Sequence, residues 1–377
     1  MRVVHVYKAI HPVKGGMENY VLALCRRLRE TAGVDAQILA TSLGLKTERT
    51  TIEGVPTVKA ARLATAASTP LSLALAPLLR QMRPDIVHLH VPYPVGELAY
   101  LLATPRAPMV MTYHSDVVRQ KTLLRAYGPA LDLVLRRARV ILATSPQYKA
   151  SSPWLRRHRV RCRIVPLGID QQRFRHPDAA TLTLAQALRA RYGPNLLHSH
   201  GVFRYYKGLR YLVEAVALVA EARLLLTGTG PEEKALRAQV AAAGLEDRVH
   251  FAGAVSDADL PAYYRAADVY VLPAVARSEA FGISMVEAQA SGLPCISTEL
   301  GTGTSYVNVH GVTGLVVPPA DAGALAEALR HLLAAGDVRR AMGRRAQARA
   351  AELFDIDAHT TTIAAIYHDV TLPPGSP

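Results

Sequence analysis

Two carboxylates, Glu279 and Glu287, stand eight positions apart around the tripeptide FGI at 281–283. An apolar segment ending at Pro273 precedes them, and a small-residue break and a new apolar run from Cys295 follow. The pattern predicts strand, loop, helix, turn and strand, with one glutamate at the helix start and the other in its body. A helix N-terminus suits phosphate, and carboxylates accept hydrogen bonds from hydroxyls. A nucleotide-sugar, with hydroxyls at both ends and phosphates between, matches this stretch.

The stretch SEAFGISMVEAQASGLPCIST at 278–298, followed by HGVTGLVVPP at 310–319, resembles the retaining glycosyltransferases of glycosyltransferase family 4. The resemblance covers nearly the whole chain and implies the GT-B fold. That fold is an α/β architecture of two Rossmann-like parallel-sheet domains facing across a cleft, with a C-terminal helix crossing back to the first domain.

The resemblance also implies roles for this stretch. Glu279 is expected to contact hydroxyls of the transferred sugar, and Glu287 those of the ribose. The backbone of three consecutive residues is expected to hold sugar and phosphate: Phe281, Gly282 and Ile283.

Residues 201–208, GVFRYYKG, match the family segment that supplies an arginine and a lysine to the diphosphate. Lys207 matches the lysine, whereas Val202 stands at the arginine position. We expect Arg204, two places along, to reach the same phosphates by a different path.

Two pairs of glycines complete the expected donor site. Gly15 and Gly16 match the family's N-terminal glycine loop, where a backbone without side chains can approach a phosphate or the acceptor closely. Gly228 and Gly230 follow directly after a predicted strand, at the edge where parallel sheets bind ligands.

Histidines end two predicted strands of the first half. His114, followed by Asp116, matches the family's active-site histidine, whose imidazole or neighbouring carbonyl faces the sugar. His88 and His90 are two positions apart and therefore share one face of their strand. We expect His90, at the strand tip, and Asp116 to lie on the acceptor side.

Metal and cofactor chemistry is not expected. An Asp-x-Asp match, Asp257 to Asp259, falls at a helix start, where capping is the expected role. Basic side chains and helix N-termini must then neutralise the diphosphate, and the nucleotide-sugar is a substrate. Cys25, Cys162 and Cys295 form neither a disulfide framework nor a zinc spacing, which favours a reducing cytoplasm.

Basic residues concentrate in the first half of the chain. Residues 1–168 hold 25 Lys and Arg against 9 Asp and Glu, a net charge of +16, whereas the remainder has −2. Twelve basic residues lie between Arg119 and Arg163, with Asp132 the one acid and Trp154 among the arginines. The alternatives are a solvated surface or an anionic partner such as a membrane or a phosphate-linked acceptor. No nucleic-acid-binding motif occurs.

Strand and helix patterns alternate along the chain, which predicts parallel sheets with crossover helices. Strands are expected at 3–7, 36–40, 84–90, 109–113, 140–144, 195–200, 222–227, 249–253, 269–273 and 295–297. Helices are expected at 17–30, 121–137, 209–221, 232–243, 257–267, 321–333, 338–353 and 357–370. No window approaches the roughly 18 uncharged apolar residues of a spanning helix. The N-terminal segment is expected to be a strand and not a signal peptide.

Three parts are expected: an acceptor-binding domain over 1–168, a nucleotide-sugar-binding domain over 169–353, and a returning helix with tail over 354–377. The segment QQRFRHPDAATLTLAQ at 171–186 is polar and broken by proline, as a hinge would be.

The function expected is retaining transfer of a hexosyl group to a glycan or lipid-linked acceptor. The segments YHSDVVRQK, RYYKGL and GTGTSYVN resemble a subgroup that builds bacterial surface polysaccharides with mannosyl or rhamnosyl donors. GDP-mannose is the preferred donor, with a UDP-sugar or GDP-rhamnose as alternatives. A same-face mechanism is preferred over a covalent intermediate on Glu279. A nucleotide-sugar epimerase, a phosphorylase and a non-catalytic binding subunit remain further alternatives. The expected location is the cytoplasm, with peripheral contact at the inner membrane face.

Overall fold

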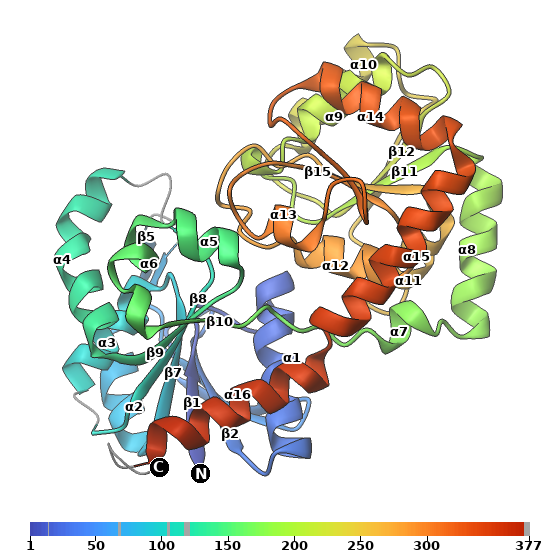
Figure 1. Cartoon of the computed structure of the whole chain (residues 1–377). Helices are drawn as coiled ribbons and strands as arrows, with labels where there is room; N and C mark the ends of the chain where they lie inside the picture. Colours follow the sequence, from blue (N-terminus) through green and yellow to red (C-terminus); the bar gives the residue numbers. More distant parts are fainter. Residues whose placement is uncertain (14, 67–68, 104–105, 117–120, 373–377) are drawn as a thin grey trace. The chain divides into compact units, whose positions relative to one another are not determined.

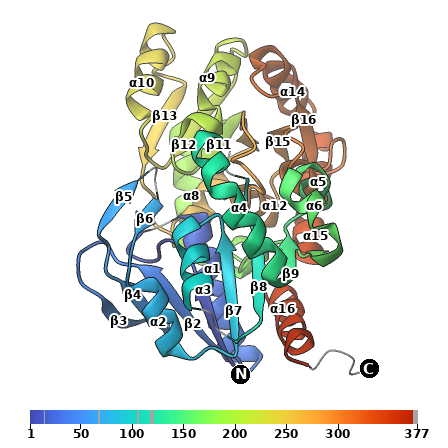
Figure 2. The same ribbon diagram turned by 90° about the vertical axis from the view of Figure 1, so that its left-hand side faces the viewer.

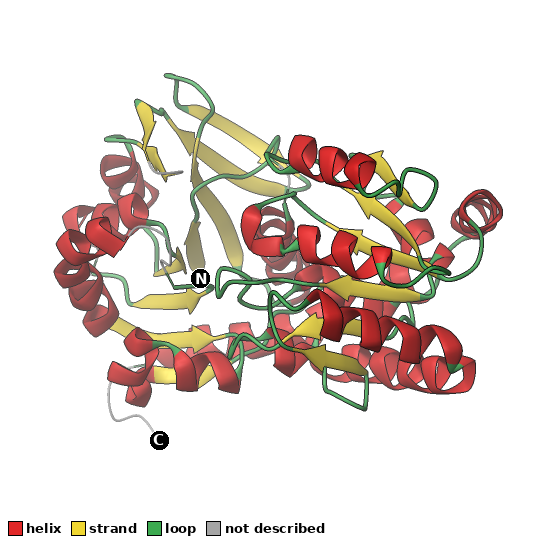
Figure 3. Ribbon diagram, turned by 90° about the horizontal axis from the view of Figure 1, so that it is seen from above, coloured by secondary structure: helices red, strands yellow, loops and turns green. Residues whose placement is uncertain are grey.

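The computed structural model describes residues 1–13, 15–66, 69–103, 106–116 and 121–372. The chain divides into two compact units, Met1–Gly168 with Ile356–Pro377, and Ile169–Asp355. Each unit holds one large sheet whose strands lie among helices (Figure 3). Parallel neighbours require a crossover connection, so alternating strands and helices produce this α/β architecture. Among the described helices, none has both the length and the apolar composition needed to span a membrane.

The sheet of unit 1 has eight strands. Their order across the sheet is β10 (Cys162–Ile164), β9 (Ala138–Ala143), β8 (Met109–Tyr113), β7 (Ile86–Val91), β1 (Arg2–Val6), β2 (Asp35–Thr41), β4 (Val55–Ala60) and β3 (Glu48–Ile52). The pairs are parallel except β3–β4, which is an antiparallel hairpin. β7 is buried along its whole length, as expected for a central strand covered on both faces. A separate two-stranded sheet pairs β5 (Ala64–Ala66) with β6 (Thr69–Leu71).

The helices of unit 1 come from both ends of the chain. They are α1 (Gly16–Thr31), α2 (Leu75–Met82), α3 (Pro94–Ala103), α4 (Lys121–Arg137), α5 (Pro146–Ser151), α6 (Pro153–Arg157), the 3-10 turn η1 (Arg159–Arg161) and α16 (Ile356–Thr371). The last helix, α16, lies beside α1 (Figure 1), and Arg27 of α1 forms an ion pair with Asp357 at 3.1 Å. α2 and α3 also lie together (Figure 2).

The sheet of unit 2 is entirely parallel. Its order is β13 (Val249–Gly253), β12 (Arg223–Thr227), β11 (Leu196–His200), β14 (Val269–Leu272), β15 (Cys295–Thr298) and β16 (Gly314–Val317). The helical segments are α7 (Gln172–Arg175), α8 (Ala179–Tyr192), η2 (Tyr205–Lys207), α9 (Leu209–Ala217), α10 (Glu233–Ala242), α11 (Leu260–Ala266), α12 (Ile283–Ala290), α13 (Thr304–Val307), α14 (Ala322–Ala334) and α15 (Gly336–Leu353).

Strand alternation produces two apolar cores in unit 2. Leu224 and Leu226 pack with α9, α10 and α14 in one cluster. Leu225, between them in sequence, packs with α8 and α11 in the other. Successive side chains of a strand point to opposite faces, so one leucine-rich strand supports both layers of helices.

The segment 171–186 contains α7 and the first half of α8, and Asp178 caps α8 by accepting the Thr181 N–H at 2.8 Å. Its role as a hinge stays a prediction. Two local expectations were wrong. Glu279 precedes α12 by four residues and lies in a loop rather than at the helix start. Asp259 stands at the N-cap of α11 but makes no side-chain capping bond.

Candidate functional site

The structure joins two side chains that the sequence placed 72 positions apart. Lys207 Nζ lies 2.7 Å from Glu279 Oε2, and the two side chains are 14% and 11% exposed. Lys207 ends η2, after strand β11, and Glu279 follows strand β14, its neighbour in the sheet. The pair therefore lies at the carboxyl edge of the unit 2 sheet, where α/β proteins bind ligands.

Gly208 brings Lys207 into this position. It has φ +65°, and an added Cβ would lie 2.0 Å from the Pro273 carbonyl oxygen. The Val275 N–H also donates to the Tyr206 carbonyl at 2.8 Å. Glycine at 208 thus lets η2 pack directly onto the end of β14, so that the lysine reaches the loop that carries Glu279.

Two opposing effects set the protonation state of Lys207. Burial alone would lower the pKa of its ammonium, but the Glu279 carboxylate, assisted by Tyr206 and Tyr270, raises that pKa above its usual range. The lysine is therefore a permanent cation. It also helps to lower the pKa of His200 to about 4, although burial is the larger cause. Without a ligand, Glu279 supplies the counter-charge.

The segment GTGTSYVN at 301–308 supports the Glu279 loop. Thr302 Oγ1 donates to the Glu279 carbonyl at 2.9 Å, and the Gly303 N–H donates to the Ala280 carbonyl at 2.7 Å. Thr302 is buried, and an added Cβ on Gly303 would lie 2.6 Å from the Ala280 oxygen. Sequence reasoning missed both residues as positioning groups, although they lie in the segment GTGTSYVN that it had singled out.

The segment FGI forms the entry to α12 as predicted. Phe281 is buried, Gly282 has φ +88° at the N-cap, and the helix begins at Ile283 without a side-chain cap. The first N–H groups of a helix have no acceptor within it, so this end offers donors and partial positive charge.

Glu287 lies one turn into α12. Tyr264 donates its hydroxyl proton to Glu287 Oε2 at 2.8 Å. Burial raises the pKa of Glu287 to about 7, against the opposing effects of Tyr264 and Arg173. In the ligand-free protein this carboxyl therefore changes charge near neutral pH.

The other donor-site predictions lie on neighbouring loops of unit 2. Arg204, at the N-cap of η2, is exposed. An added Cβ on Gly228 would lie 2.1 Å from the Gly201 oxygen, and one on Gly230 would lie 2.5 Å from the Phe203 nitrogen and oxygen. These glycines allow close packing of the β12–α10 loop on the loop that precedes Lys207. Ligand contact by these residues stays a prediction.

The N-terminal glycine loop opens α1 in unit 1. Gly15 is the N-cap in extended backbone, and Gly16 is the first helical residue. An added Cβ on Gly15 would lie 2.5 Å from Glu18 Oε2. Ligand contact by Gly15 and Gly16 stays a prediction.

His114 follows β8, at the carboxyl edge of the unit 1 sheet. It is 7% exposed, and its Nε2 lies 3.0 Å from His90 Nδ1. Burial, with Lys8 and His359, lowers the pKa of His114 to about 3, so its ring is neutral.

Asp116, also predicted on the acceptor side, accepts hydrogen bonds from Tyr113 Oη at 3.0 Å and Ser152 Oγ at 2.7 Å. Part of the motif YHSDVVRQK, residues 117–120, lies outside the described residues.

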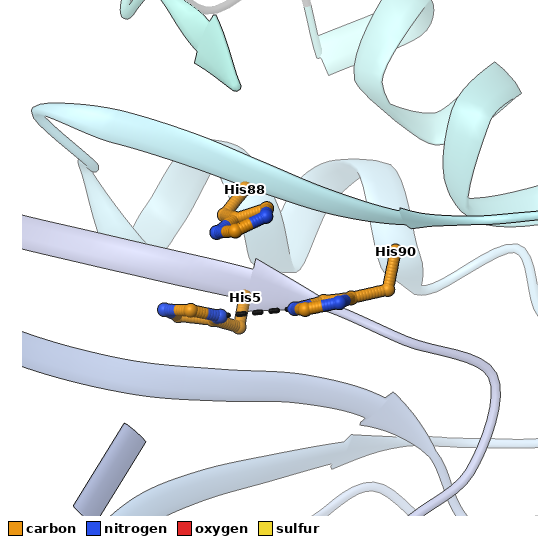
Figure 4. A group of neighbouring side chains, drawn as sticks. All are labelled: His5, His88 and His90. Carbon is orange, nitrogen blue, oxygen red and sulfur yellow. Dashed lines mark hydrogen bonds between the residues drawn. The ribbon is translucent and has the colours of Figure 1, made fainter. Parts of the chain in front are cut away.

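His90 and His88 share one face of β7, as predicted, and both are buried. His90 Nε2 lies 3.0 Å from His5 Nδ1 of the neighbouring strand β1 (Figure 4). Both ring nitrogens of His90 are thus occupied by other histidines, and direct contact with an acceptor stays an untested prediction. His5 was missed because its place beside β7 depends on the strand order.

Comparison with known proteins identifies the family. A model described as Glycosyltransferase Family 4 matches residues 14–173, and one described as Glycosyl transferases group 1 matches residues 183–349. The D-rhamnosyltransferase WbpZ of Pseudomonas aeruginosa is 38% identical over 94% of this chain and 92% of its own length. The O-antigen chain mannosyltransferase C of Escherichia coli is 34% identical over 95% of each chain.

A solved structure has the same fold. Sucrose-phosphate synthase from Thermosynechococcus elongatus matches with a TM-score of 0.81 and 23% identity, covering 98% of each chain. The resemblance read from the sequence, including its surface-polysaccharide subgroup, is confirmed. The chain belongs to glycosyltransferase family 4 and is a hexosyltransferase with the GT-B fold.

Proposed function

We propose that this enzyme transfers a mannosyl group from GDP-mannose, with retention of configuration, to a glycan or lipid-linked acceptor in the assembly of an O-antigen-type polysaccharide. The observation that carries the site assignment is the Lys207–Glu279 ion pair at the carboxyl edge of the unit 2 sheet. The relatives named for mannosyl and rhamnosyl transfer support the donor class.

In this proposal unit 2 binds the nucleotide-sugar. The Lys207 ammonium and the N–H groups at the start of α12 neutralise the departing diphosphate, and Arg204 approaches it from solvent. Glu279 accepts hydrogen bonds from sugar hydroxyls, and Glu287 from the ribose. Phosphate and Glu279 then share the lysine. This charge arrangement supports transfer without a metal, and activity that persists in EDTA tests that point.

The reaction proposed follows a same-face course. The bond from the sugar's anomeric carbon to the phosphate oxygen breaks, the acceptor hydroxyl oxygen bonds to that carbon from the same side, and its proton passes to the departing phosphate. A covalent route would need an available carboxylate nucleophile. Glu279 is engaged by the Lys207 ammonium and Glu287 by the Tyr264 hydroxyl, which supports the route without a protein nucleophile.

Donor choice is tested with three radiolabelled nucleotide-sugars: GDP-mannose, GDP-D-rhamnose and a UDP-hexose. D-rhamnose is mannose without its 6-hydroxyl. The difference in transfer between the first two donors therefore measures the effect of that one hydroxyl. Incorporation from GDP-mannose well above both others supports the proposal. Preference for GDP-D-rhamnose or for the UDP-sugar replaces the donor assignment by that alternative.

Catalysis by this site is tested with Glu279→Gln and a matched surface control, Glu246→Gln, in the presence of a lipid extract as acceptor. Loss of transfer in the first variant alone supports the site, whereas equal activity in both would contradict it. Conversion of donor without acceptor would indicate an epimerase. Binding of GDP without any turnover would indicate a non-catalytic subunit.

Unit 1 is proposed to bind the acceptor, at the cytoplasmic face of the membrane. Arg156, Arg159 and Arg161 are exposed on α6 and η1, and Val160 among them is 95% exposed. A basic surface with an apolar side chain suits an anionic lipid surface. Cosedimentation with vesicles containing anionic lipid, reduced by charge-reversal at these arginines, tests the contact. Equal binding to neutral vesicles would contradict the electrostatic explanation.

A further inference from the structure

Three histidine rings, those of His5, His88 and His90, lie together inside unit 1 (Figure 4). The rings of His88 and His90 have centroids 4.5 Å apart and planes within 14°, and those of His5 and His90 are 5.3 Å apart within 22°. His114 extends this group: its ring centroid lies 5.3 Å from that of His90, and the two ring planes are within 8° of each other. All four rings are buried. Imidazoles with no solvent access must satisfy their nitrogens among themselves and their neighbours.

A continuous series of hydrogen bonds runs through these four histidine rings and the Tyr367 hydroxyl. From the far end, the contacts are Thr112 Oγ1 to His88 Nε2 at 2.7 Å, His88 Nδ1 to Tyr367 Oη at 2.5 Å, Tyr367 Oη to His5 Nε2 at 3.2 Å, His5 Nδ1 to His90 Nε2 at 3.0 Å, and His90 Nδ1 to His114 Nε2 at 3.0 Å. Tyr367 belongs to α16, the C-terminal helix. Among the described residues, nothing hydrogen-bonds to His114 Nδ1.

We propose that this series of hydrogen bonds, the hydrogen-bond chain, positions His114. It fixes the orientation and tautomer of the His114 ring, so that His114 Nδ1 is a hydrogen-bond acceptor for a hydroxyl group of the bound substrate. The substrate role rests on the proposed glycosyl transfer. The tautomer itself is a property of the free protein.

Neutral rings allow only two directions for such a chain. Burial lowers the pKa of all four histidines, to about 3 for His5 and His114. A neutral imidazole has one N–H and one bare nitrogen, so the donor choice at one link sets the next. When the Tyr367 hydroxyl donates to one of its two histidines, either all four rings carry the proton on Nε2, or all four carry it on Nδ1.

The Tyr367 hydroxyl selects between these directions. Its single proton goes to His88 Nδ1 or to His5 Nε2, and O–H donors make shorter hydrogen bonds than N–H donors. We therefore assign the O–H bond to the 2.5 Å contact with His88, and assign the 3.2 Å contact to an N–H of His5 donating to the phenol oxygen.

This choice then passes along the chain to His114. His5 accepts from His90, and His90 accepts from the Nε2–H of His114. His114 Nδ1 is left with a bare lone pair, in a ring that ends a strand at the ligand-binding edge of the sheet.

A metal centre at His5, His88 and His90 is the competing interpretation, since one nitrogen from each ring lies within 4.8 Å of the others. The lone pair of an imidazole nitrogen lies in its ring plane, and His5 Nδ1 and His90 Nε2 are directed at each other across 3.0 Å. A tetrahedral ion needs ligand atoms that converge on one point. The hydrogen-bond contacts described above already occupy both nitrogens of each ring.

The tautomers can be measured directly in the full-length protein with ¹⁵N-labelled histidine and long-range ¹H–¹⁵N NMR, without substrate. We expect Nε2–H signals with bare Nδ1 nitrogens for His5, His88, His90 and His114. Four Nδ1–H rings, or a protonated His114 at pH 7, would overturn the proposal. Binding of one equivalent of Zn²⁺ with loss of these N–H signals would overturn it in favour of a metal site.

Tyr367→Phe tests the positioning role because it keeps the ring and removes the hydroxyl that selects the direction. The expected results are mixed tautomers at His114 and a fall of about tenfold in kcat, the size expected for one hydrogen bond, with little change in the donor KM. Tyr20→Phe is the matched control, since Tyr20 packs edge-on to His114 and bonds His359 but lies outside the chain. Tyr20→Phe should leave the tautomers unchanged.

His5→Phe removes the link between Tyr367 and His90 while keeping a buried aromatic ring, and tests the same role if Tyr367→Phe does not fold. Unchanged His114 tautomer and kcat in the folded chain variants would overturn the proposal. Wild-type protein with the expected tautomers but no transferase activity would contradict the proposed function alone.

Discussion

The Lys207 ammonium lies 2.7 Å from the Glu279 carboxylate. The side chain predicted to bind phosphate and the side chain predicted to bind the sugar therefore neutralise each other in the free protein. In the proposed complex the donor phosphate shares the Lys207 ammonium with Glu279, and the carboxylate keeps an oxygen for the sugar hydroxyls. The site is therefore preorganised in charge before any ligand arrives.

Lys207→Met should lower kcat by about 10²–10³-fold, because the diphosphate loses its buried cation. Lys234→Met, on the exposed face of α10, is the control and should retain activity. Combining Lys207→Met with Glu279→Gln should cost less stability than the sum of the single changes, with a coupling of about 1–3 kcal/mol in urea unfolding. Strict additivity would show that the ion pair contributes nothing.

Nucleotide affinity should depend on pH through Glu287. Burial raises the pKa of this carboxyl from 4.5 to about 7, so its stabilising contribution to the fold is complete below pH 4.5 and is lost as pH rises through 7. A ribose hydroxyl donates best to the ionised form. GDP should thus bind more tightly as pH rises from 6 to 8, by calorimetry.

Glu287→Gln provides the reference for that series. The ionisation of GDP itself is common to both proteins, so the difference between the two curves isolates the carboxyl. Identical pH curves for wild type and variant would contradict the assignment of Glu287 to the ribose.

Thr302→Val should reduce kcat by about tenfold while lowering the free energy of unfolding by about 1 kcal/mol. The hydroxyl that it removes donates to the Glu279 carbonyl at 2.9 Å and so fixes the loop that carries the carboxylate. Thr183→Val removes a hydrogen bond of the same length to a helix carbonyl at an exposed position and should not change kcat. Equal kinetic effects in both variants would argue against a positioning role.

Gly228→Ala should destabilise unit 2 by at least about 2 kcal/mol more than Gly244→Ala in thermal or urea unfolding. Both glycines have positive φ, +116° and +63°, which costs an alanine about 1–2 kcal/mol. The added methyl at 228 would also meet the Gly201 oxygen at 2.1 Å, whereas nothing lies within 4 Å at 244. Equal losses would show that the two loops move apart without cost.

Local patterns predicted most of the unit 2 elements and the entry to α12. Apolar periodicity and the glycines that mark turns are both visible within short stretches of sequence. The β3–β4 hairpin escaped prediction. Its turn at Glu53 and Gly54 has positive φ at both residues, and the sequence offers only one glycine there. Helix α8 escaped prediction because Pro177 stands directly before its cap, Asp178.

The sequence allowed the residues of the site to be identified, but it did not predict which of them are in contact. Lys207 and Glu279 were both identified, but their ion pair depends on the order β11–β14 in the sheet, which no single strand encodes. His5 and Tyr367 are the clearest misses, since their importance appears only when β1, β7 and α16 are assembled.

The return of α16 to unit 1 has a consequence for the order of events during synthesis. Tyr367 and His5 are 362 positions apart, and all of unit 2 is translated between them. A nascent chain can complete unit 2 while unit 1 still lacks a helix and the hydroxyl that orients its histidines. Unit 1, although it begins first, is finished last, and His114 acquires its fixed proton only when translation has passed the final helix.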